Sequence, residues 1–229
     1  MFLKLQTILL SIRPKPSAFL FDLNGTMIND MYYHIKAWHD ILNDFGANIS
    51  MEQMKLECYG KNEELLERIL PGRFSGEQKK SMSIEKEIAY QREYRPQLEL
   101  IKGLPLFLDK AKEHGIKMSI GSAAIMFNID FVLDGLNIRD YFSSLVSADD
   151  VSHSKPHPET YLKCADALGL AYGSCVVFED SPKGVEAAAN AGMRAVVITT
   201  MHAKEEFSGF DNIICFIEDY NDEQLNELF

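Results

Sequence analysis

The sequence predicts an α/β protein whose core is a Rossmann-like, doubly wound parallel sheet carrying an inserted, small all-helical cap. Short buried apolar segments alternate with amphipathic helical segments through the second half of the chain, which is typical of such a sheet. A helical stretch without a convincing strand separates the first apolar segment from the rest. We expect an N-terminal extension over 1–16, a core formed by 17–30 and 97–229, and a cap over 31–96.

The extension begins with an apolar run that Lys4 and Gln6 interrupt, and no small-residue cleavage site follows before Arg13. We interpret it as an extension of a cytoplasmic protein, with a secretion signal or membrane anchor as the alternative. No later segment approaches the about 18 consecutive apolar residues that a membrane span requires. We therefore expect no membrane partner.

The first strand is expected over 17–22, where an apolar run ends on a carboxylate and a turn follows. In the cap, Gly46 suits a helix C-terminus, Ser50 and Gln53 form a capping box, and Asn62 can cap the next helix. A long charged helix is expected over 83–94, ended by Pro96.

Beyond Gly103 the pattern alternates between helices and strands. Pro105 suits the first turn of a helix that Gly115 ends. Helices are then expected over 129–136, 159–169 and 182–190, and strands over 116–123, 143–148, 174–180, 194–199 and 212–218.

Charge and cysteine content limit the possible partners. The 229 residues contain 34 acidic and 23 basic side chains, a net charge of −11, which argues against a nucleic-acid or anionic-membrane partner. The four cysteines are scattered without zinc-ligand spacing, so we expect reduced thiols: Cys58, Cys164, Cys175 and Cys215. An anionic substrate would need locally placed cations.

Polar residues lie at the carboxyl ends of three of the predicted strands. They include Asp22, Ser122, Glu179 and Asp180. Lys155 lies in a loop before a helix. Because the carboxyl ends of parallel strands meet at one edge, these side chains should converge there. Carboxylates can hold Mg²⁺ or act as a nucleophile, and a hydroxyl with an ammonium can bind phosphate, so the set predicts phosphoryl transfer. Any one of them alone could simply cap a helix.

The segments FDLNGT, SIGSA, KPHPETY and VVFEDSPKGVEAAANAGM, in this order, resemble the four motifs of the haloacid dehalogenase (HAD) superfamily. The resemblance covers nearly the whole chain after Ala18 and implies a four-helix cap inserted after the first motif. It implies that Asp22 becomes phosphorylated. It also implies an Mg²⁺ site at Asp22, the backbone carbonyl of Asn24, and Glu179 or Asp180. The phosphoryl-binding residues that it implies are Thr26, Ser122, Ala123 and Lys155.

Within the superfamily the chain looks most like β-phosphoglucomutase and related phosphatases, because the segment YHIKAW is similar to the YHxxAW segment of the mutases. The resemblance places His34 near the acid/base residue and Trp38 in the substrate pocket. Four residues apart, they share one helix face. The alternative is a buried aromatic seam of the cap with a hydrogen-bonded histidine.

The first motif departs from the family pattern, because Asn24 stands where the family has a second Asp that transfers a proton. An amide cannot exchange a proton at neutral pH. Losing such a group typically slows a reaction by about 10²–10⁴-fold, most for poor leaving groups. We therefore expect a phosphatase for a small phosphorylated metabolite, and not an efficient mutase.

Two alternatives remain open. Lys61 in the cap can contact a phosphate or, as in phosphonoacetaldehyde hydrolases, form a Schiff base for cleavage of a carbon–phosphorus bond. A catalytically weakened protein that binds a phosphometabolite or a protein partner is the second alternative. We expect a monomer or weak dimer.

Overall fold

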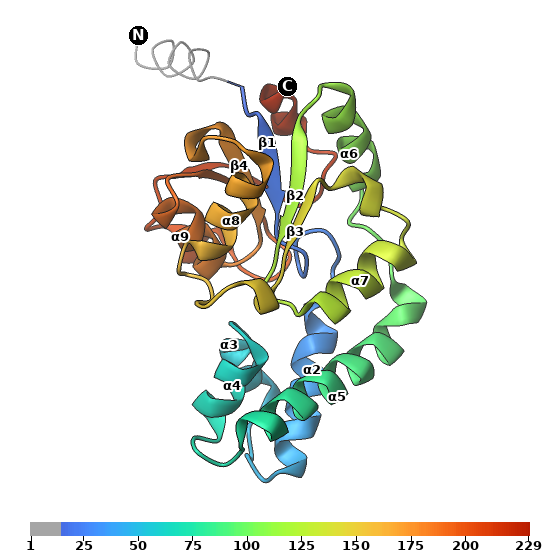
Figure 1. Cartoon of the computed structure of the whole chain (residues 1–229), viewed down its shortest axis with the longest axis vertical. Coiled ribbons are helices and arrows are strands. Elements are labelled where there is room, and N and C mark those ends of the chain that lie inside the picture. The colour runs from blue at the N-terminus through green and yellow to red at the C-terminus, as the bar shows by residue number, and fades with distance from the viewer. Residues whose placement is uncertain (1–14) are drawn as a thin grey trace.

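The computed structural model describes residues 15–229, which form an α/β core with a helical cap at one end (Figure 1). Nearly all of the expected N-terminal extension, and with it the question of a secretion signal or anchor, lies outside these residues. Among the helices in the described range, none combines the length and hydrophobicity needed to cross a membrane. All four cysteines are free thiols.

The core contains a parallel sheet of six strands in the described range, in the order β3-β2-β1-β4-β5-β6. This is the order of a doubly wound nucleotide-binding sheet, so the predicted fold class is confirmed. The strand bounds are β1 (Ala18–Phe21), β2 (Lys117–Gly121), β3 (Ser144–Val146), β4 (Cys175–Glu179), β5 (Arg194–Ile198) and β6 (Ile213–Ile217). Strand β1 lies between β2 and β4, so the first predicted motif occupies the middle of the sheet.

Side chains of the central strand alternate between two hydrophobic layers. Phe19 and Phe21 of β1 pack into one layer with helices α6 (Leu104–Glu113) and α7 (Met126–Gly135). Ala18 and Leu20 pack into the other with α8 (Glu159–Leu168) and α9 (Pro182–Asn190). Since β1 is buried on both faces, a continuous apolar segment is required there, and fully burying one such phenylalanine contributes about 2–3 kcal/mol.

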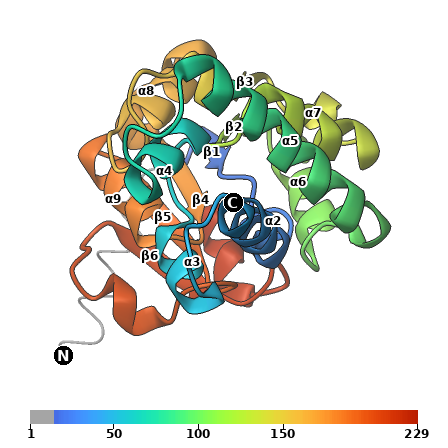
Figure 2. The same ribbon diagram turned by 90° about the horizontal axis from the view of Figure 1, so that it is seen from below.

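The cap is formed by α2 (Met31–Asp44), α3 (Met51–Glu57), α4 (Asn62–Ile69) and α5 (Gly76–Tyr94). Its own hydrophobic cluster is centred on Trp38, Leu42 and Leu66. Figure 2, viewed from the cap side, shows α2 to α5 arranged around the end of the core that the central strands point toward. The short connections on either side of the cap thus place its helices over the strand ends.

Most of the residues predicted to begin or end the cap helices lie at helix ends. The capping box of Ser50 and Gln53 forms as expected. Asn62, expected as a cap, is instead the first helical residue after Lys61. Helix α5 begins seven residues earlier than expected because Ser75 accepts a hydrogen bond from the N–H of Gln78 and forms a second capping box. The helix ends at Tyr94, and Pro96 lies within a following 3₁₀ turn over Arg95–Gln97.

Candidate active site

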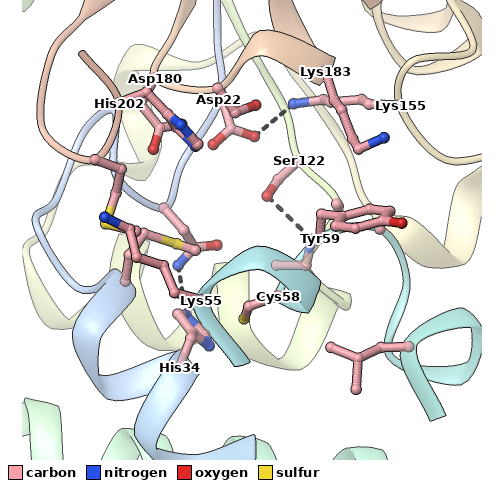
Figure 3. Close-up of a pocket in the computed structure, with 18 of the residues that line it drawn as sticks. Asp22, His34, Lys55, Cys58, Tyr59, Ser122, Lys155, Asp180, Lys183 and His202 are labelled. Atoms are coloured by element: carbon pink, nitrogen blue, oxygen red, sulfur yellow. Dashed lines mark hydrogen bonds and ion pairs between the residues drawn. The ribbon is translucent and has the colours of Figure 1, made fainter. Parts of the chain in front are cut away.

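The ends of β1, β2 and β4 bring the predicted polar residues together. Phe21 pairs in register with Ile120 on one side and Phe178 on the other, so Asp22 lies beside the last residues of both neighbouring strands. One oxygen each of Asp22, Glu179 and Asp180 lies within 4.8 Å of the others, and all three residues are buried. We call these three carboxylates and Lys155 the strand-end cluster, of which Asp22, Asp180 and Lys155 are labelled in Figure 3.

Lys155 is buried in this cluster and donates hydrogen bonds to Asp22 Oδ1 at 2.6 Å and to Glu179 Oε1 at 2.7 Å. Burial alone would lower the pKa of Lys155, but the two carboxylates raise it above its ordinary value. Lys155 is therefore protonated, because the nearby carboxylates stabilise its positive charge.

The carboxyl groups respond differently to this excess of negative charge. Burial raises the pKa of Asp22 to about 7 even though Lys155 opposes the shift. Burial, followed by the charges of Glu179 and Asp22, raises the pKa of Asp180 well above its ordinary value. For Glu179, burial is outweighed by Lys155, so its pKa is lowered. The cluster is thus short of positive charge.

Glu179 and Asp180 also differ in their hydrogen bonds. Glu179 Oε1 accepts from Lys155 and from the Tyr161 hydroxyl at 2.8 Å, and Oε2 accepts from the N–H groups of Asp180 and Ser181. The hydrogen bond found for the Asp180 carboxylate comes from Thr26 Oγ1, at 3.4 Å. Asp180 therefore retains more capacity to bind a cation.

Two glycines leave the space that these carboxylates occupy. A Cβ atom at Gly25 would overlap the Asp180 carboxylate, and Gly25 also has a φ of +76°, in the left-handed region that favours glycine. A Cβ atom at Gly184 would overlap the Glu179 carboxylate. The backbone therefore approaches both acids closely and holds them at the strand end.

Of the other residues predicted to bind the phosphoryl group, two line the cavity and one does not. Ser122 and Ala123 line the cavity next to the strand-end cluster, and Ser122 Oγ accepts a hydrogen bond from the N–H of Ala124 at 3.2 Å. Thr26 is completely buried, and its hydroxyl donates to Asp180 Oδ1 at 3.4 Å. It is not among the residues that line the cavity. In this arrangement Thr26 contacts the Asp180 carboxylate and does not face the cavity.

Asn24 belongs to a second buried group, which sequence reasoning found only in part. Its Nδ2 donates to Asp30 Oδ2 at 2.5 Å and lies 2.9 Å from His34 Nε2. The Asp30 carboxylate also accepts from the Tyr90 hydroxyl at 2.6 Å and from the N–H of Gly25 at 3.2 Å. Asp30 lies four residues before His34, with Nε2 of the histidine 3.1 Å from Oδ2, so this spacing was an available signal.

Helix α5 completes this group. Lys86 Nζ lies 2.6 Å from His34 Nδ1 and donates to Glu87 Oε1 at 2.9 Å, and both Lys86 and Glu87 are buried. We call Asn24, Asp30, His34, Lys86 and Glu87 the cap-side cluster. Burial opposes it, but His34 lowers the pKa of Asp30, and Lys86 and then His34 lower the pKa of Glu87. Both acids are thus ionised and paired.

A cavity of about 410 Å³ lies between the strand-end cluster and the cap. Trp38 and His34 line it, and Trp38 is also part of the hydrophobic cluster of the cap. The titratable residues that line the cavity and were not singled out from the sequence include Lys55, Lys183 and His202, which are labelled in Figure 3. Lys55 lies in α3 of the cap and His202 in the loop after β5, outside the four motifs, whereas Lys183 lies in the first turn of α9, inside the fourth motif.

The cap contacts the core at the cavity rim. The Tyr59 ring lies between the Arg68 guanidinium, 3.8 Å from the ring centroid, and the Lys183 ammonium, at 4.2 Å. The N–H of Lys61 donates to Ser154 Oγ at 3.2 Å, and its ammonium donates to the backbone carbonyl of Val151. Lys61 therefore bridges the cap to the core and is not among the residues that line the cavity.

The fold and the strand-end cluster define a class of hydrolase, and comparison with known proteins agrees. The family model of haloacid dehalogenase-like hydrolases matches residues 19–198, and the chain belongs to this family. It is an HAD-like hydrolase of the branch that contains β-phosphoglucomutase and phosphatases.

Several similar proteins are named for an activity. Fructose-1-phosphate phosphatase YqaB of Escherichia coli is 32% identical, over 77% of this chain and 93% of that protein. Hexitol phosphatase B of Escherichia coli is 29% identical, over 82% and 86%. A crystal structure of β-phosphoglucomutase from Clostridium difficile has a TM-score of 0.81 and 27% identity, covering 93% of this chain and 96% of that one.

Proposed function

We propose that the protein is an Mg²⁺-dependent phosphatase that hydrolyses the phosphate ester of a small sugar or sugar alcohol through a phosphorylated Asp22. The observation that supports it most is the position of Asp22, 2.6 Å from a buried ammonium and beside two further carboxylates, at a cavity of about 410 Å³. The cavity suits a ligand of modest size, and two relatives are named for sugar and hexitol phosphates.

The cation would be held by Asp22, the backbone carbonyl of Asn24 and Asp180. An excess of carboxylates at one point, with a raised pKa for Asp22 and Asp180, is the donor set that a hard divalent cation prefers. Between the two candidate acids we favour Asp180, because burial leaves its pKa raised, whereas the adjacent Lys155 lowers the pKa of Glu179 and already supplies its counter-charge. Bound Mg²⁺ would offset the negative charge of the phosphoryl group.

In the first step a carboxylate oxygen of Asp22 attacks phosphorus, and the bond from phosphorus to the ester oxygen breaks. The departing alkoxide takes its proton from water in the cavity, because Asn24 cannot supply one. Lys155 and Ser122 hold the phosphoryl oxygens, and Lys155 favours the ionised form of the nucleophile. Water then attacks the aspartyl phosphate and releases inorganic phosphate. These steps regenerate Asp22 and need no further reactant.

Asn24 would orient a reacting hydroxyl or water without exchanging a proton. Donation from Nδ2 to Asp30 places the amide nitrogen on the protein side, so its carbonyl oxygen is the atom left to accept a hydrogen bond from the ligand. Without a proton donor for the ester oxygen, sugar esters should be hydrolysed more slowly than acyl or aryl phosphates, whose leaving groups are better.

A phosphate-ester panel tests this account in the presence of Mg²⁺. We expect acetyl phosphate and p-nitrophenyl phosphate to be hydrolysed faster than fructose 1-phosphate or a hexitol phosphate. Asn24→Asp should raise sugar-phosphate hydrolysis about 10²-fold and p-nitrophenyl phosphate hydrolysis much less. An equal effect on both classes of ester would contradict the role given to Asn24.

A double variant serves as the matched control for Asn24→Asp. Asn24→Asp places a carboxyl group where Nδ2 now lies 2.5 Å from the Asp30 carboxylate, and the two acids would repel each other. The exchanged double variant Asn24→Asp/Asp30→Asn keeps one acid and one amide in this contact. We expect it to retain the gain on sugar phosphates, because the proton-transferring carboxyl group is present in both variants.

The two alternative functions have less support. The Schiff-base mechanism assigned to Lys61 needs its ammonium at the substrate, whereas this ammonium donates to the Val151 carbonyl and Lys61 does not line the cavity. The binding-protein hypothesis would leave ligand binding without turnover, which the panel would detect as an absence of phosphate release from every ester.

A further inference from the structure

The loop that carries Lys155 holds a second group of potential metal ligands. His153 and His157 lie two residues before and two residues after Lys155, and Glu159 begins α8. One ligand atom from each of these three residues lies within 4.8 Å of the others. Both histidines are exposed, and none of the three lines the active-site cavity. The group is therefore separate from the strand-end cluster.

Glu159 is held in place before any ion binds. Its carboxylate accepts hydrogen bonds from the backbone N–H groups of Ser152, at 3.0 and 3.1 Å, and of His153, at 3.0 Å. The Lys163 ammonium lies 2.9 Å from Oε1. The hydrogen bond from Lys163 and those from the backbone lower the pKa of Glu159 to about 2, so the group is a carboxylate at physiological pH. Such outer contacts orient the ligands of metal sites.

The distances suit a small tetrahedral ion. His153 Nδ1 lies 3.4 Å from Glu159 Oε2, which is long for a hydrogen bond but equals the separation of two ligands with bonds of about 2.1 Å at a tetrahedral angle. The N–H of Glu159 donates to His157 Nδ1 at 3.3 Å, a long hydrogen bond that an ion bound at Nδ1 would replace. The two imidazole centroids are 4.6 Å apart.

We propose that His153, His157 and Glu159 bind one transition-metal dication of the Zn²⁺ type, with water completing the coordination. Two imidazoles and one carboxylate favour Zn²⁺, Co²⁺ or Ni²⁺, whereas Mg²⁺ prefers oxygen ligands, as in the strand-end cluster. The chain would thus carry two chemically distinct cation sites, one at the ends of β1 and β4 and one on the loop that carries Lys155.

A bound ion would restrict the motion of the loop that carries Lys155. An ion bound at once to His153 and His157 links the backbone on both sides of Lys155, whose ammonium contacts Asp22 and Glu179. Opening of this loop would then require loss of a metal ligand. Binding of the ion should therefore slow amide hydrogen exchange over residues 152–158 while leaving the cap helices unchanged.

The test is a Co²⁺ titration of the full chain, freed of metal and kept in excess Mg²⁺ so that the oxygen site does not take Co²⁺. We expect one equivalent to bind with the intense visible absorption of tetrahedral Co²⁺, and Zn²⁺ to displace it. His153→Ala and His157→Gln should each weaken binding about tenfold or more, and the double variant should abolish the absorption.

The matched control is His39→Gln, because His39 also lies beside a carboxylate, 3.0 Å from Asp40, without a second histidine. It should bind Co²⁺ as the unaltered chain does. Absence of tetrahedral absorption in the unaltered chain would overturn the proposal. Binding that survives the double histidine variant but is lost in Asp180→Asn would also overturn it, since the ion would then occupy the strand-end cluster.

Discussion

The strand-end cluster and the cap-side cluster are both buried and polar, yet their charges are balanced differently. In the cap-side cluster two carboxylates face the Lys86 ammonium and the His34 ring, and the pKa of each acid is lowered. In the strand-end cluster three carboxylates face the single ammonium of Lys155, and the pKa of two of them is raised.

The difference separates a structural arrangement from a reactive one. Buried charges that are paired and hydrogen-bonded hold a fold together, and removing one partner is costly. Buried acids without sufficient counter-charge are destabilised as ions and bind a cation or a proton. By this argument the acids of the cap-side cluster have sufficient counter-charge, although Glu87 Oε2 is buried without a hydrogen-bond partner among the described residues, whereas the strand-end cluster needs a cation and a phosphoryl group.

Removal of the proposed nucleophile should have the largest effect. Asp22→Asn preserves size and hydrogen bonding at the end of β1 but cannot form an acyl phosphate, so we expect phosphate release to fall about 10⁴-fold or more. The measurement is hydrolysis of p-nitrophenyl phosphate in Mg²⁺. Asp130→Asn, at an exposed carboxylate near Arg139, serves as the control and should retain full activity. Substantial turnover by Asp22→Asn would contradict the mechanism.

Breaking the cap-side cluster should act on stability. Asp30→Asn removes the acceptor shared by Asn24, His34 and Tyr90, so we expect a loss of about 3 kcal/mol in the free energy of unfolding, measured with urea. Because the pKa of Asp30 is lowered in the folded state, its contribution is present above its ordinary pKa and disappears as pH falls through the folded value. A variant as stable as the unaltered chain would show that this cluster is not structural.

The effect of Mg²⁺ should depend on pH. The pKa of Asp22 is about 7 in the folded protein, above its ordinary value of 3.8, so the folded state binds extra protons between these values and loses stability as pH rises through that window. Mg²⁺ competes with those protons. We therefore expect Mg²⁺ to raise the Tm more at about pH 8 than at about pH 5.5, and Asp180→Asn to reduce the rise. Equal shifts at both pH values would argue against a cation in this cluster.

The smallest effect is expected at the contact between cap and core. Tyr59→Ala removes the ring between Arg68 and Lys183, and a cation–π contact of about 0.5–1 kcal/mol corresponds to about a two- to fivefold increase in KM. Tyr59→Phe keeps the ring and should leave KM unchanged. If both variants behave alike, the stacking contact does not contribute to closure of the cap.

The strand-end residues could be predicted because a parallel sheet converts chain order into spatial order. Asp22 and Glu179 each lie at the end of a strand, and those strands are neighbours, so their convergence follows from the alternating pattern. Lys155 lies in a loop, and its position was inferred from a family resemblance together with its charge.

The cap-side contacts could not be predicted, because they depend on how helices pack. Tyr90 and Lys86 lie more than fifty residues from the residues that they contact in α2 and before it. No local pattern shows which face of α5 meets α2. The direction of Lys61 likewise depends on docking of the cap against the core, where its ammonium finds a backbone carbonyl.

The most direct test of the central claim is a crystal structure of the protein with Mg²⁺ and beryllium fluoride, which mimics a phosphoryl group on a carboxylate. The account predicts the fluoride adduct on a carboxylate oxygen of Asp22, with Lys155 and Ser122 contacting its fluorines and Mg²⁺ bound by Asp22 and Asp180. An adduct on another side chain, or Mg²⁺ bound away from Asp22, would contradict it.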